Sequence, residues 1–499
     1  MKTVLNRIGS RGGRLAFAGA VAATTLTLLL GSPARGGVTS DQKAPGRSAG
    51  VTTSFAPVVK KVAPSVVRVD TSIKAKESGF SGGPGSDNPM FRWFFGEQPG
   101  QRGPGRRLYT PPQRGVGSGV IVSHDGYILT NNHVVDGADQ VKVSLQDGRV
   151  LTAKVVGTDP QTDVAVLKID GNDLPYVEMA DSDKIEVGDI VLAIGNPYGI
   201  GQTVTSGIVS ATGRATLGLE YEDFIQTDAS INEGNSGGAL VDADGRLIGI
   251  NTAIFSPMGS NGGNIGIGFA IPTDLARFVM DSLIKDGRVS RGFIGVIIQN
   301  VTPALAKEFK LKEQTGALVG EVKPNGPADK AGFKSGDVVI EFNGKPVTDS
   351  RQFKLQVAQI KPGKTVSAKV LRDGATKTLE VTTKELPSGD RLAKAGSHES
   401  KDQGTLNGVT VSDLDTRVRR EMDAPANLKG VLVTEVEPDS AAFEAGLRPG
   451  DVILEINRQP VKSADEAVRM TENAKDKTTL LRVWNKGDSR FVVVDETNG

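Results

Sequence analysis

The C-terminal part of the chain contains a long internal repeat, which restricts how many domains the chain must form. Segment 316–324 (GALVGEVKP) returns as 430–438 (GVLVTEVEP), and segments 328–339 and 441–453 share the pattern AGxxxGDV. The spacing is about 114 residues, far above that of a solenoid, so the two copies are whole domains. With 499 residues, the chain also has room for a further domain ahead of the repeat.

The part ahead of the repeat, between residues 116 and 275, is built from short β-branched runs divided by turns. Glycine is abundant, with 62 residues, and aromatic residues make up only 5%. Both features favour glycine-punctuated β structure. Many short strands at this spacing predict barrels or sandwiches. The predicted fold class is therefore mainly β. The clearest strand-like runs are 120–122, 141–145, 153–156 and 190–194.

A serine is held between glycines in the run Gly234, Asn235, Ser236, Gly237 and Gly238. Glycines allow backbone conformations that other residues resist, and they let a carbonyl group approach backbone N–H groups closely. We propose the N–H groups of Gly234 and Ser236 as an oxyanion hole. The alternative is a glycine-rich hairpin with an incidental serine. A base elsewhere in the chain would favour the nucleophile.

Of the three histidines, His133 is the best candidate for that base. His398 lies in a polar stretch that reads as a linker, and His124 lies in a turn signal, SHDG. His133 instead ends a strand-like run and precedes two valines, where a scaffold can hold it rigidly.

Asp163 is the candidate acid that would orient this histidine. It directly precedes the apolar run 164–169, where partial burial of its side chain is expected. A carboxylate at this position can fix the tautomer of a histidine and stabilise its imidazolium form, or it can simply cap a turn. The chain order His133, Asp163, Ser236 is one of three unrelated orders known for this geometry.

Segments 130–135 (TNNHVV), 162–167 (TDVAVL) and 234–240 (GNSGGAL) resemble the trypsin-like serine proteases of the HtrA/Deg family, close to its periplasmic DegP/MucD type. The resemblance implies two β-barrels with the triad His133, Asp163 and Ser236 in the cleft between them. It also implies a serine endopeptidase for unfolded or damaged proteins that needs no cofactor and no metal. Two alternatives stay open: a PDZ-based chaperone or scaffold with secondary proteolysis, and a site-specific regulatory protease of a stress-signalling pathway.

The same resemblance implies a substrate-binding stretch around the nucleophile. Ile250 and its neighbours suggest a small apolar residue before the cleaved bond, since no acid stands at an obvious pocket base. The residues expected to line the pocket or pair with substrate backbone are Asn235, Asn251, Thr252, Ala253 and Ile254.

The two repeat copies resemble PDZ domains, which capture chain ends by β-addition. Segment 291–296 (RGFIGV) matches a carboxylate-binding loop. The resemblance implies that this loop, Phe293 included, binds a peptide carboxylate through the N–H groups of Ile294, Gly295 and Val296. The second copy departs from the pattern at Asn407, so it either binds peptides or serves only assembly. The implied partners are unfolded polypeptides and C-terminal peptides, with homotrimers or higher multiples as the assembly.

Residues 1–36 read as an export signal. Basic residues precede an apolar run at 15–30 and small residues at 31–34. We expect cleavage near residue 34, a periplasmic location and no stable membrane insertion afterwards; an uncleaved anchor is the alternative. The domains expected behind it are a protease domain at 54–275, PDZ domains at 282–385 and 405–497, and a linker at 386–404.

Residues 76–115 form an insertion rich in Gly, Pro, Ser and Arg, with an aromatic cluster at 90–95. A loop of this length inside a compact domain is usually functional or disordered. It resembles the regulatory loop of DegP-type proteins, which reaches the active site of another subunit. The alternative is an aromatic patch folded onto its own domain.

The composition and the remaining motifs argue against several other functions for this chain. The chain has no cysteine, so it has neither disulfides nor thiolate metal ligands, and its net charge of +1 gives no reason to expect nucleic-acid binding. The glycine patterns at 115–119 and 266–268 open no evident helix, as a dinucleotide motif requires. Segment 363–365 lacks the first glycine of a phosphate loop.

Overall fold

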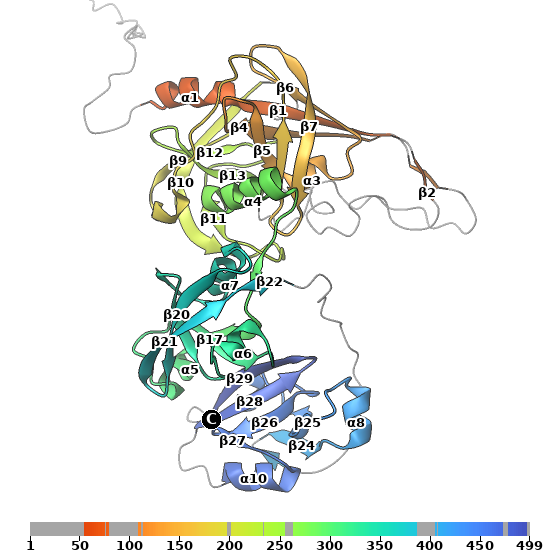
Figure 1. The fold of residues 1–499 in the computed structure, drawn as a ribbon, viewed down its shortest axis with the longest axis vertical. Helices are drawn as coiled ribbons and strands as arrows, with labels where there is room; N and C mark the ends of the chain where they lie inside the picture. The colour runs from red at the N-terminus through yellow and green to blue at the C-terminus, as the bar shows by residue number, and fades with distance from the viewer. Residues whose placement is uncertain are drawn as a thin grey trace, which may run out of the picture. The chain divides into compact units, whose positions relative to one another are not determined.

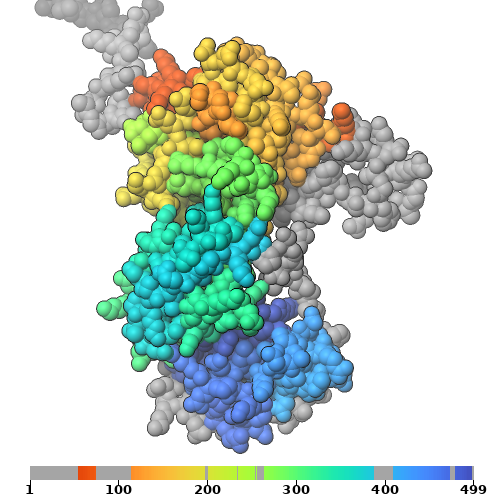
Figure 2. All heavy atoms as spheres, in the orientation of Figure 1, coloured from red at the N-terminus to blue at the C-terminus, as the bar shows by residue number. Residues whose placement is uncertain are grey.

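The computed structural model describes residues 54–74, 76–78, 108–110, 113–196, 201–232, 234–254, 263–386, 405–406, 408–472 and 478–496. These residues are coloured in Figure 2, and the others are grey. The predicted export signal, the aromatic segment 90–95 and nearly all of the predicted linker lie outside the described residues. None of the described helices is long and apolar enough to cross a membrane.

The described chain begins with a short helix, α1 (Ala56–Val62), and a closed six-stranded barrel follows it in the sequence (Figure 1). Helix α3 (Asn132–Val135) follows the strand β5, and a separate pair, β2 (Lys76–Ser78) and β3 (Leu108–Thr110), stands at the base of the 76–115 insertion. Around the barrel, the strand order is β1 (Val66–Ile73), β4 (Gln113–Ile121), β5 (Tyr127–Asn131), β8 (Val164–Lys168), β7 (Val150–Asp159) and β6 (Gln140–Ser144).

A second closed barrel follows, and helix α4 (Thr273–Asp286) comes after it. Together the two barrels confirm the mainly β prediction for this part of the chain. The strand order is β10 (Thr203–Arg214), β11 (Phe224–Thr227), β14 (Gly268–Pro272), β13 (Leu247–Ile254), β12 (Ala239–Asp242) and β9 (Ile190–Gly195).

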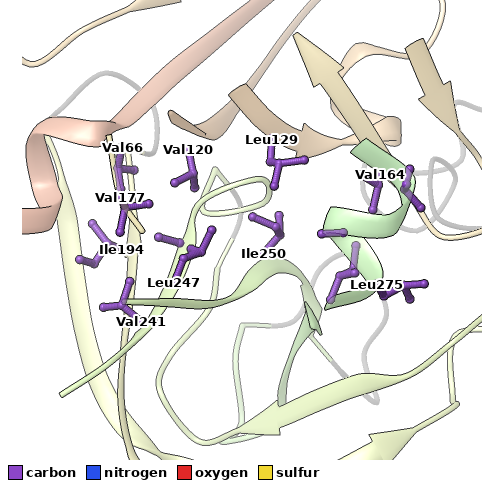
Figure 3. Packing of buried hydrophobic residues seen from close by; sticks show 14 of the residues in the cluster. Val66, Val120, Leu129, Val164, Val177, Ile194, Val241, Leu247, Ile250 and Leu275 are labelled. Atoms are coloured by element: carbon purple, nitrogen blue, oxygen red, sulfur yellow. The ribbon is translucent and has the colours of Figure 1, made fainter. Parts of the chain in front are cut away.

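One apolar cluster joins the two barrels (Figure 3). Leu129 and Val120 come from the first barrel, Leu247 and Ile250 come from the second, and all four side chains are buried. Helix α4 adds Leu275 and continues the cluster beyond the second barrel. Burying one such side chain stabilises the fold by about 1.5–3 kcal/mol. The cluster therefore fixes how the two barrels face each other.

The glycines of strand β4 allow close packing within this part of the fold. A Cβ atom on Gly117 would lie 2.7 Å from Cγ1 of Val134, and one on Gly119 would lie 2.8 Å from Cγ2 of Ile128. Contacts this short do not occur for real Cβ atoms, so only glycine fits. Packing against neighbouring side chains thus accounts for the glycine pattern at 115–119.

The two repeat copies form a six-stranded and a seven-stranded sheet, which share five strands in matching order. Each copy has a register irregularity between its first two strands, at Ile297/Ile298 and at Thr410/Val411. Helices α7 (Ser350–Gln359) and α10 (Ala464–Glu472) occupy equivalent places in the chain. The strand orders are β16 (Val296–Asn300), β17 (Ala317–Val322), β18 (Val338–Phe342), β20 (Thr365–Arg372) and β21 (Ala375–Thr382), and then β24 (Val409–Asp413), β25 (Val431–Val436), β26 (Val452–Ile456), β28 (Thr478–Asn485) and β29 (Asp488–Asp495).

Polar contacts connect the first repeat copy to the barrels. Nη2 of Arg291 lies 2.5 Å from Oδ2 of Asp159, and both side chains are only 6% exposed. The guanidinium of Arg291 also stacks on the ring of Tyr221, at 4.4 Å from its centroid. Nearby, Arg351 pairs with Asp223. Burial raises the pKa of the Asp223 carboxyl above its usual value, although Arg351 opposes this shift.

The cluster between the barrels can be tested by Leu129→Ala. Leu129 is fully buried there, so truncation leaves a cavity, and we expect the free energy of unfolding to fall by about 2–5 kcal/mol. Denaturant unfolding followed by hydrogen exchange of the barrel strands β5 and β8 measures the change. Val150→Ala is the control, because Val150 is 60% exposed and its truncation should change stability by at most about 0.5 kcal/mol. Equal effects of the two changes would contradict this account of the cluster.

Candidate active site

His133 lies in α3, directly after β5, and is buried against Asp163. Nδ1 of His133 is 2.7 Å from Oδ2 of Asp163, and the backbone N–H of His133 donates to Oδ1 at 2.9 Å. The carboxylate therefore holds both the ring and the backbone of the histidine. In this geometry Nδ1 carries the proton, which leaves Nε2 as the basic nitrogen.

Asp163 sits in the turn between β7 and β8 with a φ of 59°, in the left-handed region that few non-glycine residues adopt. Two groups on the preceding strand and helix donate to its backbone carbonyl, the N–H of Asn132 at 3.0 Å and Nδ2 of Asn131 at 3.1 Å. Oγ1 of Thr252 donates to its Oδ2 at 2.9 Å. These contacts hold the strained backbone and aim the carboxylate at His133.

Ser236 comes from the second barrel, in the connection between β11 and β12, and is 1% exposed. Its Oγ donates to the backbone carbonyl of Thr252 at 3.0 Å. Thr252 thus contacts Asp163 through its side chain and Ser236 through its backbone. The structure brings the three predicted residues His133, Asp163 and Ser236 together around this threonine, at the junction of the barrels.

The turn that carries Ser236 requires its glycines. Gly234 has a φ of 91° and Gly237 a φ of 83°, and a Cβ on Gly237 would lie 2.0 Å from the carbonyl oxygen of Ser118. Within the described part of the chain, the N–H groups of Gly234 and Ser236 take part in no hydrogen bond. Both groups remain our proposed oxyanion donors.

Ser118, on β4 of the first barrel, anchors this turn, and the sequence analysis missed its role. Its N–H donates to the carbonyl of Ser236 at 2.8 Å, and its Oγ donates to the carbonyl of Gly234 at 2.6 Å. Oγ1 of Thr130 in turn donates to the carbonyl of Ser118 at 2.7 Å. The sequence feature that indicates this role is the serine inside the glycine run 115–119, a run that the sequence analysis considers only as a dinucleotide-binding motif.

The other residues predicted near the nucleophile lie on or beside β13. Asn235 is 3% exposed, and Asn251 is fully buried, with its Nδ2 donating to the carbonyl of Ala239 at 3.0 Å. Ile254 belongs to an apolar cluster of the second barrel. Ala253 lies on the same strand, but its side chain is not among those described. Their roles toward substrate stay predictions.

Ile250 is fully buried in the cluster between the barrels, because β13 is covered on both faces. The small apolar residue expected before the cleaved bond stays a prediction.

Backbone hydrogen bonds from neighbouring segments hold the predicted carboxylate-binding loop of the first repeat copy. Phe293 lies in β15 (Gly292–Phe293), Ile294 is 2% exposed, Gly295 has a φ of 81°, and Val296 begins β16. The N–H of Ala328 donates to the carbonyl of Ile294 at 2.8 Å, and the N–H of Lys323 donates to that of Gly295 at 2.9 Å. Carboxylate binding by this loop stays a prediction.

One acidic group with metal-binding geometry is found among the described residues, formed by Asp181, Asp183 and Asp274. It contains none of the triad residues. Nζ of Lys345 lies 2.8 Å from Asp183, and Nζ of Lys184 lies 3.0 Å from Asp181. Protein ammonium groups therefore already balance part of its charge.

Two closed barrels, with a buried histidine–carboxylate pair on one and a glycine-held serine on the other, define a trypsin-like serine peptidase. Family models agree: residues 117–250 match a trypsin-like peptidase domain, and residues 264–383 and 432–485 each match a PDZ domain. The protein is a serine endopeptidase with two PDZ domains.

Curated relatives identify the family. A probable periplasmic serine endoprotease DegP-like of Marinomonas sp. (strain MWYL1) is 42% identical over 451 residues, covering 88% of this chain and 92% of the relative. One of the same name from Rhizobium meliloti (strain 1021) is 41% identical over 476 residues, covering 89% and 92%. The chain belongs to the DegP-like serine endoproteases of the HtrA family, as its motifs suggested.

Solved structures agree with this assignment. The HtrA-type protease AlgW with a tripeptide is 46% identical and covers 68% of this chain and 99% of its own, with a TM-score of 0.52. The same protease with a decapeptide is 47% identical and covers 67% and 99%, with a TM-score of 0.50.

The contact between Thr252 and Asp163 can be tested by Thr252→Val, which removes the hydroxyl but keeps the side-chain shape. A hydrogen bond to a charged group contributes about 1.5–3 kcal/mol, so we expect kcat to fall by about tenfold as the carboxylate loses its aim. KM should change little. Thr205→Val is the control, because the hydroxyl of Thr205 donates to the carbonyl of Ser230 instead. Unchanged kcat in Thr252→Val would show that this contact does not position Asp163.

Proposed function

We propose that this protein is a periplasmic quality-control protease that degrades unfolded or damaged proteins through an acyl-enzyme on Ser236. The observation that carries the proposal is the buried pair of His133 and Asp163, 2.7 Å apart, beside a serine held by a glycine turn. A nucleophilic serine requires such an oriented base.

The proposed reaction begins when the hydroxyl of Ser236 turns from the carbonyl of Thr252 toward Nε2 of His133. His133 takes the proton as Ser236 attacks the peptide carbonyl, and Asp163 stabilises the imidazolium. The N–H groups of Gly234 and Ser236 hold the oxyanion. His133 then protonates the leaving amine, and water attacks the acyl-enzyme with the same histidine as base.

The proposed substrate is a polypeptide. A substrate strand pairs with the backbone near β13, where Thr252 contacts the nucleophile, and the loop 293–296 of the first PDZ domain captures chain ends. Solved structures of an HtrA-type protease with a tripeptide and a decapeptide support peptide binding in this family. We further propose a protease domain at 54–275, PDZ domains at 282–385 and 405–497, and assembly as a homotrimer or a multiple of it.

The proposed periplasmic location rests on two findings. The curated relatives are named periplasmic. Residues 1–36 also have the basic, apolar and small-residue order of an export signal. In this proposal the 76–115 insertion regulates access to the active site of a neighbouring subunit.

Ser236→Ala tests the nucleophile. We expect casein cleavage by the mature protein to fall at least about 10³-fold, because the attacking oxygen is removed. Gel and fluorescence assays of casein cleavage measure this loss. Ser206→Ala is the control, because Ser206 is an exposed serine on β10 and its removal should leave cleavage unchanged.

Equal cleavage by wild type and Ser236→Ala would contradict the proposed nucleophile. The same variant separates the alternative functions. If it still suppresses the aggregation of an unfolded protein, a chaperone activity exists beside proteolysis. If wild type cleaves one defined protein but not casein, a regulatory protease replaces the quality-control role.

A further inference from the structure

We propose that the hydroxyl group of Ser118 positions the oxyanion hole and thereby sets the rate of the chemical step. Ser118 is a positioning residue in this proposal, because it acts through Gly234 and Ser236 and does not touch the substrate. The inference rests on the proposed function, in which the N–H groups of these two residues stabilise the oxyanion. It adds a residue of the first barrel that holds both donors.

Ser118 binds both donor residues through their carbonyl groups. Its Oγ donates to the carbonyl of Gly234 at 2.6 Å, and its backbone N–H donates to the carbonyl of Ser236 at 2.8 Å. Within the part of the chain that the structure describes, the N–H groups of Gly234 and Ser236 have no acceptor. A single residue therefore holds the two donor residues by their carbonyls and leaves their N–H groups for a substrate oxygen.

The place of Ser118 on β4 makes the backbone contact possible. β4 pairs with β1 from Gln113 to Val120, whereas its pairing with β5 is limited to Val120 and Ile121. At Ser118 the second edge of β4 is therefore not used by another described strand, and the turn that carries Ser236 lies against it. The first barrel thus offers an open strand edge at the point where the second barrel brings its nucleophile.

The hydroxyl group of Ser118 is fully buried and makes two hydrogen bonds. Its oxygen accepts from the backbone N–H of Asn196 at 2.8 Å. Because a carbonyl oxygen can only accept, the hydroxyl proton is the one that Gly234 receives. Asn196 follows directly on β9, which pairs with β12, the strand after Ser236. The hydroxyl therefore joins three segments that meet at the nucleophile.

Ser118 is itself held in place on its other side. Oγ1 of Thr130 donates to its carbonyl at 2.7 Å. A Cβ on Gly237 would lie 2.0 Å from the same carbonyl oxygen and 2.3 Å from Oγ1 of Thr130, so only glycine allows this approach. With its N–H, carbonyl and hydroxyl all bonded, Ser118 forms a rigid anchor for the turn.

The turn depends on this anchor because its glycines give it little stiffness of its own. Gly234 has a φ of 91° and Gly237 a φ of 83°, a left-handed conformation that glycine enters and leaves readily. Oxyanion donors act only when they lie about 2.7–3.1 Å from the oxygen that carries the charge. A turn with flexible residues on both sides of Ser236 keeps this geometry only if its carbonyls are held.

The two contacts that Ser118 donates can be separated by substitution. Any residue other than proline keeps the backbone N–H and its bond to Ser236, whereas the contact to the carbonyl of Gly234 comes from the side chain. Removal of the hydroxyl therefore loosens the Gly234 donor and leaves the Ser236 donor held. Removing an oxyanion donor outright lowers the rate by about 10²–10³-fold, so loosening one should have a smaller effect.

Kinetics of Ser118→Ala in the full chain test the hydroxyl. We expect kcat for a fluorogenic peptide to fall by about tenfold while KM changes by less than about twofold, because the lost contact acts on the transition state and not on peptide binding. Ser65→Ala is the matched control. Ser65 is 1% exposed and its Oγ donates to the carbonyl of Val62 at 2.6 Å, so its kcat should stay unchanged. Unchanged kcat in Ser118→Ala would overturn the inference.

A peptide boronic acid of the same sequence separates positioning from stability. It bonds to Oγ of Ser236 and places an oxygen in the oxyanion hole, so it resembles the transition state. We expect its inhibition constant to rise by about tenfold in Ser118→Ala and to stay unchanged in Ser65→Ala. A merely structural role would lower the melting temperature of both variants and leave both inhibition constants unchanged. That result would overturn the inference.

Ser118→Cys decides the case in which Ser118→Ala does not fold. A thiol is a weaker donor than a hydroxyl, so we expect kcat to fall by at least about threefold. Wild-type kcat in Ser118→Cys would overturn the inference. An inactive wild type that binds no boronic acid would instead refute the proposed function, and the inference with it. An active wild type with an unaffected Ser118→Ala would refute the inference alone.

Discussion

The apolar contact between the two barrels is the interaction on which the catalytic arrangement depends. His133 and Asp163 belong to the first barrel and Ser236 to the second, so neither barrel contains the site alone. Buried side chains such as Leu129 and Ile250 fix the spacing of the barrels. Close-packed interiors transmit even small changes of volume, so this cluster sets the distance between the proposed base and the proposed nucleophile.

Two polar residues, one from each barrel, fix the positions of the Ser236 turn and of the Asp163 carboxylate. Ser118 reaches from the first barrel and binds the carbonyls on both sides of the Ser236 turn. Thr252 reaches from the second barrel and donates to the Asp163 carboxylate. Each barrel thus holds the proposed catalytic group of the other. Because these bonds are buried, losing one partner would leave the other unsatisfied, which is costly.

The sequence predicted the short strands, the repeat and the triad candidates because each depends on a local pattern, whereas the choice of barrels over sandwiches came from the family resemblance. Short β-branched runs, a period of about 114 residues and a glycine-held serine can all be read without tertiary contacts. Ile250 could not be placed, because β13 is buried on both faces and so lacks the alternation that reveals a strand's orientation. The positive φ of Asp163 and the anchoring role of Ser118 arise only from contacts between distant segments.

The most direct measurement of the central claim is covalent labelling by a fluorophosphonate, located by mass spectrometry. This reagent captures serines that an adjacent base has activated. The account predicts one adduct per chain, on Ser236, and at least about a 10³-fold slower reaction after His133→Ala. An adduct on another serine, or equally fast labelling of Ser236 without His133, would contradict the account.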